Sequence, residues 1–189
     1  MLWKTTTERT LTMPMRSNRA LWLCVAILAA ACASASLVFA CATPFAAFGV
    51  LAAAMLPARQ AMIAVALSFA VNQMIGYGIL GYPQALNSVL WGAVMLGAAL
   101  LTTAAAAAIF RRFAGMSVYA VYPVALLAAY AVYEIALLAP VPVLGGGDSF
   151  TVEIVGHLAF VNAAWLAGLV VVCELLRRFD VLAVRQRSV

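Results

Sequence analysis

Ten polar and aromatic residues interrupt long apolar stretches of this chain, and these residues could do chemistry. They are Asn72, Gln73, Tyr77, Asn87, Trp91, Tyr130, Glu134, His157, Asn162 and Trp165. Together they supply amides, one imidazole, one carboxylate and several flat rings, but no Lys or Arg. An anion would find no cationic partner among them. The set favours a site for a neutral or cationic ring compound, stacked on an aromatic face and hydrogen-bonded at its edges.

Helical spacing places several of these residues on shared faces. Tyr130 and Glu134 are four residues apart, as are Asn87 and Trp91. Residues at i and i+4 lie above one another on a helix. Glu134 is the most informative of the set, because a carboxylate inside a long apolar segment is costly and marks a functional or paired group.

Six apolar blocks must position these residues. A membrane-spanning helix needs about 20 apolar residues, and hydrophobic residues make up 67% of the chain while charged residues make up 9%. We therefore predict an all-α integral membrane protein, a single six-helix transmembrane bundle with a short second span. The expected spans are Ala20–Ala40, Pro44–Leu56, Ala61–Leu80, Ala85–Phe110, Ala114–Pro140 and Phe150–Leu176.

The 11 Lys and Arg residues all lie at the edges of these blocks. Cytoplasmic loops of membrane proteins carry an excess of basic residues. If both termini are cytoplasmic, every basic residue falls on the cytoplasmic side, and Asp148 and Glu153 fall near the outer side. We therefore expect a tail at 1–19, a transmembrane domain at 20–176 and a basic tail at 177–189. The net charge of +5 follows from this asymmetry and indicates no nucleic-acid partner.

This orientation gives each polar residue a depth. The polar residues of spans three to six then gather toward the outer ends, whereas the cytoplasmic halves are almost entirely Ala, Leu, Val and Met. We predict one cavity at the outer side, lined by the ten residues named above.

Several alternatives stay open. The run Ala20–Ala31, preceded by Arg16 and Arg19 and followed by Ala33-Ser34-Ala35, resembles a cleavable secretory signal, although the apolar run continues through Phe39. Met13 or Met15 could be the start instead of Met1. The polar residues could serve helix packing in a structural or assembly protein. An intramembrane enzyme would have to use His157 with Glu134 or Glu153. We expect no catalytic activity, cofactor or metal site.

The segment Thr43–Met55 is led by a proline and rich in small residues, and it is followed by the polar stretch Asn72–Gly78. With the short length and six spans, these segments resemble the substrate-binding S components of energy-coupling-factor vitamin transporters. The resemblance covers most of the chain as architecture and about 40 residues as sequence.

This resemblance implies a protein of the bacterial inner membrane. It would capture a vitamin or vitamin precursor from the outer side of that membrane. The resemblance also implies partners: a transmembrane coupling subunit and cytoplasmic ATPases. In that family, small residues on the first helix contact the coupling subunit. Here Ala26, Ala30 and Ala33 have the matching spacing.

Overall fold

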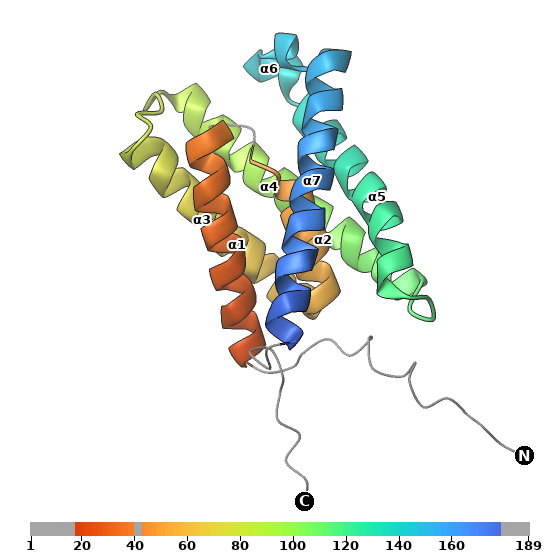
Figure 1. Ribbon diagram of the computed structural model, residues 1–189. Helices are drawn as coiled ribbons and strands as arrows, with labels where there is room; N and C mark the ends of the chain where they lie inside the picture. The colour runs from red at the N-terminus through yellow and green to blue at the C-terminus, as the bar shows by residue number, and fades with distance from the viewer. Residues whose placement is uncertain (1–17, 40–42, 179–189) are drawn as a thin grey trace, which may run out of the picture.

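The computed structural model describes residues 18–39 and 43–178, and every regular element there is a helix (Figure 1). The predicted all-α fold is confirmed. Seven α-helices and one 3-10 turn follow one another as α1 (Asn18–Phe39), α2 (Phe45–Met55), α3 (Ala58–Gly78), α4 (Leu86–Arg112), α5 (Val118–Leu138), α6 (Val141–Leu144), η1 (Gly147–Ser149) and α7 (Val152–Arg178).

Among the described residues, four helical segments are long and apolar enough to cross a membrane: α3, α4, the stretch from α5 through α6, and α7. Large apolar side chains point outward along them, including Leu127, Ile135 and Phe160. An apolar surface of this extent is expected where lipid, and not water, surrounds the helices. The chain is an all-α membrane protein.

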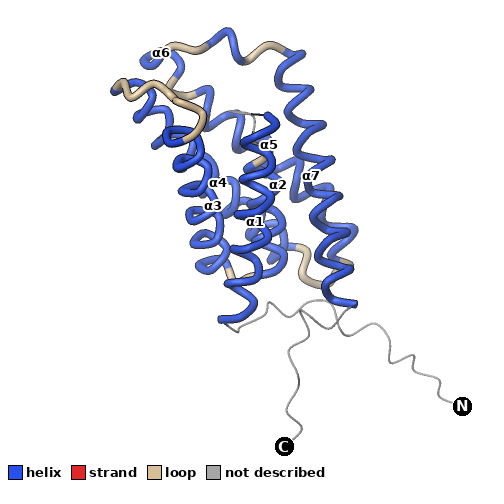
Figure 2. Tube along the Cα trace, turned by 60° about the vertical axis from the view of Figure 1, so that its left-hand side comes forward, coloured by secondary structure: helices blue, strands red, loops and turns tan. Residues whose placement is uncertain are grey.

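The second predicted span does not cross the bundle. The α2 helix has 11 residues, so it is about 16 Å long at 1.5 Å per residue, roughly half the hydrocarbon thickness. Its residues from Phe45 to Ala52 are all buried. The helix lies inside the bundle and contacts α1, α3, α4, α5 and α7 (Figure 2). A helix that is apolar all round belongs in such an interior.

The small residues of α2 let α4 approach its backbone closely. A Cβ atom placed on Gly49 would lie 2.8 Å from Thr103 Oγ1 and 3.3 Å from the Thr103 Cα and N atoms. Such a short approach is the usual role of small residues between membrane helices.

We expect Gly49→Ala to lower the free energy of unfolding by about 1–3 kcal/mol, the usual range for overpacking a tight contact. The added methyl group must displace both a side chain and the backbone of α4. Gly97→Ala is the matched control, because a Cβ there meets nothing within 4 Å. Thermal unfolding of the purified variants measures both effects. Equal melting temperatures for the two variants would contradict the close approach of α2 and α4.

The segment between α5 and α7, which lies outside the predicted spans, contains two short elements, α6 and η1. Two glycines permit the turn: Gly145 and Gly146 have φ angles of 78° and 89°, a region that glycine enters without steric strain.

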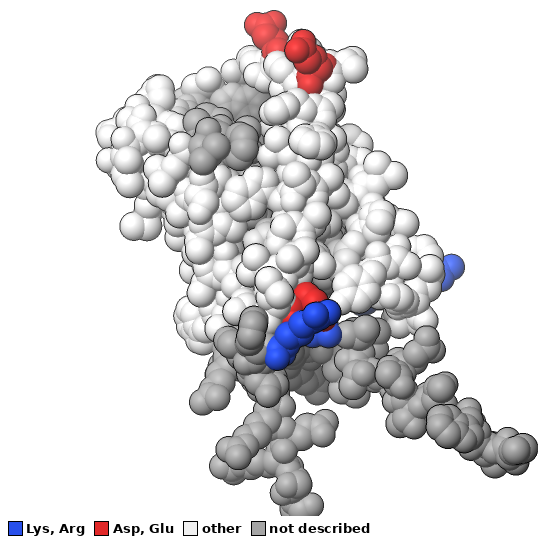
Figure 3. Space-filling model, in the orientation of Figure 1, with Lys and Arg blue, Asp and Glu red and all other residues white. Residues whose placement is uncertain are grey.

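In the face shown in Figure 3, one end of the bundle carries acidic side chains, and the other carries basic side chains with an acidic neighbour. Asp148 in η1 and Glu153 in the first turn of α7 belong to the first, acidic end. At the basic end, Glu174 pairs with Arg177 at 3.4 Å and with Arg178 at 4.0 Å. The positive-inside rule predicts that the basic end faces the cytoplasm. The predicted tails 1–19 and 177–189 lie almost entirely outside the described residues, as do Met1, Met13 and Met15, so those predictions stay predictions.

Candidate functional site

A cavity of about 350 Å³ opens toward the acidic end of the bundle, between α4, α5, α7, the α6–η1 segment and the residue that precedes Pro44. We call it the Glu134 pocket. It is lined by Thr43, Trp91, Met95, Tyr130, Tyr133, Glu134, Leu137, Gly146, Ser149, Phe150, Leu158 and Asn162.

Four of the ten predicted site residues line the Glu134 pocket. Trp91 comes from α4, Tyr130 and Glu134 come from α5, and Asn162 comes from α7. The pocket thus combines an indole face, a phenol, a carboxylate and an amide within a mostly apolar wall. Small-molecule sites commonly have this composition.

One oxygen of the Glu134 carboxylate is an unsatisfied hydrogen-bond acceptor. Its Oε1 atom is buried and has no hydrogen-bond partner among the described residues. The nearby Tyr130 hydroxyl donates its one proton to the Val155 carbonyl oxygen at 2.6 Å. A buried acceptor without a donor is unfavourable unless a ligand or water supplies one.

Asn162 has a structural task at the base of the pocket. Its Oδ1 atom accepts a hydrogen bond from the Ala47 N–H in the first turn of α2, at 3.0 Å, and its Nδ2 atom donates to the Leu158 carbonyl at 2.9 Å. Pro44, the N-cap residue of α2, makes no side-chain cap hydrogen bond. The amide on α7 therefore satisfies a donor that would otherwise be orphaned at a helix start inside the bundle.

The α6–η1 segment covers the indole at the mouth of the pocket. A Cβ atom on Gly146 would lie 3.5 Å from Trp91 Cζ2, so the backbone packs on the ring. Ser149 and Phe150 continue the same wall. Gly146 therefore contributes backbone to the wall of the pocket beside the Trp91 indole.

Asn72 lies in a different polar cluster, between α1, α3 and the residue before Pro44. Its Nδ2 atom donates to Ser36 Oγ at 2.8 Å and to Thr43 Oγ1 at 3.0 Å. Its Oδ1 atom accepts from Gln73 Nε2 at 3.2 Å. The side chain is 3% exposed and is absent from the pocket lining. The bonds to Ser36 and Thr43 tie α3 to α1 and to the residues before α2, and both amide N–H groups are engaged.

The other predicted site residues also lie away from the Glu134 pocket. The Tyr77 hydroxyl pairs with Ser88 Oγ at 3.0 Å. Trp165 packs edge-on against Phe48, with ring centroids 6.3 Å apart. Asn87 and His157 are exposed. The structure therefore gathers four of the ten residues, and Asn72, Gln73, Tyr77, Asn87, His157 and Trp165 are not part of the lining.

Sequence reasoning missed several lining residues that helical spacing could have found. Met95 follows Trp91 by four residues, Leu137 follows Glu134 by three, and Leu158 precedes Asn162 by four. Residues at such spacings share a helix face. Their side chains are apolar, and in a chain this apolar the sequence does not distinguish a residue that lines a pocket from one that faces lipid or the core.

Two of the three alanines predicted to form a docking surface on α1 are exposed on the outside of the bundle. Ala26 and Ala30 are exposed, and Ala33 is half-buried. Trp22 is exposed on the same helix.

Within the described residues, no group of three or more His, Cys, Asp or Glu side chains is placed to hold a metal ion. Comparison of the chain with protein-family models, with curated proteins and with solved structures finds no match.

Proposed function

We propose that this protein is a substrate-binding membrane subunit that captures a neutral or cationic ring compound in the Glu134 pocket. The buried Glu134 oxygen without a hydrogen-bond partner carries the proposal, because it lies in a cavity that also presents Trp91 and Tyr130. A ligand that donates an N–H or O–H to this carboxylate would satisfy it.

The lining selects the class of ligand. The residues around the pocket include a carboxylate but no Lys or Arg, so an amine or protonated ring nitrogen is favoured over a phosphate or carboxylate. The Trp91 indole offers a face for stacking on a flat or cationic ring. A volume of about 350 Å³ suits a compound at the small end of ligand sizes. A vitamin or vitamin precursor with a cationic ring fits these requirements.

Transport energy would come from other subunits. The sequence contains no phosphate-binding Gly-Lys-Ser or Gly-Lys-Thr loop. In the proposed arrangement, the acidic end faces outward in the inner membrane and receives the ligand. A transmembrane coupling subunit docks on α1 around the exposed Ala26 and Ala30, and cytoplasmic ATPases drive release. This arrangement extends the resemblance to the S components of vitamin transporters.

The two other classes account for less of the geometry. A purely structural role suits Asn72, which bonds to Ser36 of α1 and to Thr43 before α2, but it gives no reason for the buried Glu134 oxygen. A catalytic pair of His157 with Glu134 lacks support, because the imidazole is exposed and absent from the pocket lining.

A ligand screen by thermal unfolding tests the proposal on the purified full-length protein. We expect a cationic or neutral ring compound to raise the melting temperature, since a ligand at 100 times its Kd stabilises the folded state by about 2.7 kcal/mol. Thiamine and its precursors represent the cationic class, and the phosphorylated form of each hit is its matched anionic control. If no vitamin or precursor stabilises the protein, or if the phosphorylated forms bind best, the proposal is wrong.

A further inference from the structure

A second cavity, of about 380 Å³, lies at the basic end of the bundle. It is bordered by the end of α2, the start of α3, the last turns of α4 and the start of α5. We call it the Arg111 pocket. It shares no lining residue with the Glu134 pocket and has no part in the proposed function.

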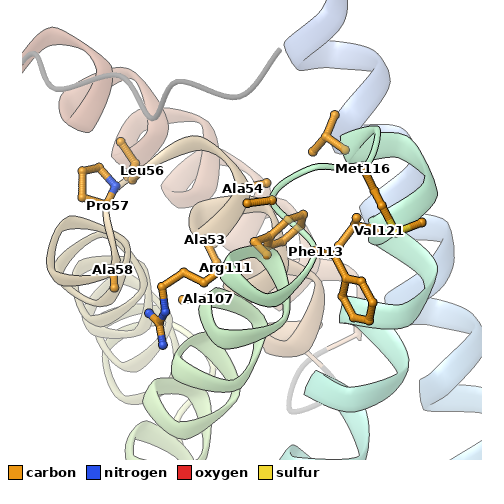
Figure 4. Close-up of a pocket in the computed structure, with 13 residues that line it drawn as sticks. Ala53, Ala54, Leu56, Pro57, Ala58, Ala107, Arg111, Phe113, Met116 and Val121 are labelled. Carbon is orange, nitrogen blue, oxygen red and sulfur yellow. The ribbon is translucent and has the colours of Figure 1, made fainter.

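The wall of the Arg111 pocket is apolar except at one position. The lining includes the apolar side chains of Ala54, Phe110, Phe113 and Met116. Among the described residues that line the pocket, Arg111 alone is charged. In Figure 4 the Arg111 side chain extends toward Ala58 at the start of α3. An apolar cavity with a cation at its edge matches a ligand that has an apolar body and an anionic group.

Arg111 is free to pair with such a ligand. It makes no ion pair with any described residue, whereas Arg177 and Arg178 pair with Glu174. The neighbouring Arg112 lies over the Phe113 ring, 5.7 Å from its centroid. The start of α3 adds a weaker attraction for an anion, because Pro57 supplies no side-chain cap there and helix starts favour negative charge.

The position of the pocket decides between possible amphiphiles. The last turn of α4 holds Arg111 and Arg112 where an apolar helix ends, which is the depth at which arginines meet lipid headgroups. Basic pockets between membrane helices bind the headgroups of anionic lipids. Lipids of the surrounding leaflet can also reach this site without leaving the membrane. We propose that the Arg111 pocket binds an anionic phospholipid, with the phosphate on the Arg111 guanidinium and part of an acyl chain against the apolar wall.

Native mass spectrometry of the delipidated full-length protein in a neutral detergent tests this site. The probes are phosphatidylglycerol, phosphatidylcholine with the same acyl chains, and inorganic phosphate. We expect retention of phosphatidylglycerol in preference to phosphatidylcholine, and no retention of phosphate alone. Equal retention of the two lipids would contradict the role of charge, and tight binding of phosphate alone would contradict the role of the acyl chain.

Variants then locate the lipid. Arg111→Gln should weaken phosphatidylglycerol binding about tenfold or more, because a charge-assisted hydrogen bond is lost, and Arg111→Lys should retain part of the binding. Arg112→Gln is the matched control and should bind within about twofold of the parent, since it removes the same charge outside the cavity lining. Equal losses for Arg111→Gln and Arg112→Gln would show a diffuse attraction and overturn the proposal.

The cavity itself is tested by filling it. Ala54→Phe should reduce phosphatidylglycerol binding while Arg111 and its charge stay in place. Ile63→Phe is the control, because that side chain is exposed on α3 and is not part of the lining. Thermal unfolding confirms that each variant is folded before lipid is added. Unchanged binding in folded Ala54→Phe would place the lipid elsewhere.

Discussion

Glu134→Gln is expected to weaken binding of a cationic ring compound about 10- to 150-fold. The substitution keeps the shape and removes the charge, so it changes a charge-assisted hydrogen bond of roughly 1.5–3 kcal/mol into a weaker neutral one. A calorimetric titration with the cationic compound found by the thermal screen measures the change. The unliganded variant should be at least as stable as the parent, because a neutral amide is less costly to bury than a carboxylate that lacks a partner.

Glu153→Gln is the matched control for this prediction. Glu153 lies at the same acidic end, is exposed, and does not line the Glu134 pocket. Its replacement should leave affinity nearly unchanged. If both variants lose affinity equally, the ligand responds to the general negative potential of that end of the protein. If neither loses affinity, Glu134 has no part in binding.

The helical fold could be predicted from the sequence because the spans are apolar blocks with basic residues at their predicted cytoplasmic edges. The block Pro44–Leu56 was also recognisable as short for a span. Its central position could not be predicted. A Gly- and Ala-rich apolar helix can pack inside a bundle or lie against lipid, and the choice depends on contacts such as that between Gly49 and Thr103.

The candidate site could be predicted only in part. The position of a residue along each apolar block predicts its depth in the membrane, so polar residues of four spans were expected to meet. Depth does not determine direction. Residues of α4, α5 and α7 meet at the Glu134 pocket, whereas Asn72 of α3 points to Ser36 of α1. Pairs within one helix, such as Tyr130 and Glu134, could be predicted because the helical repeat alone fixes them.

Asn72→Leu is expected to lower the free energy of unfolding by about 2–4 kcal/mol. It removes the hydrogen bonds to Ser36 and Thr43, each worth roughly 0.6–1.7 kcal/mol between membrane segments, and a third bond to Gln73 of the same helix. Thermal unfolding in detergent measures the loss, and Asn87→Leu is the control because Asn87 is exposed.

Ligand binding separates this structural role of Asn72 from a direct one. The folded fraction of Asn72→Leu should bind the compound found by the thermal screen with nearly the parent affinity, since Asn72 does not line the Glu134 pocket. A stability loss no larger than that of Asn87→Leu would mean that the hydrogen bonds to Ser36 and Thr43 contribute little. Lost binding at unchanged stability would instead place Asn72 in the ligand site, as the sequence pattern first indicated.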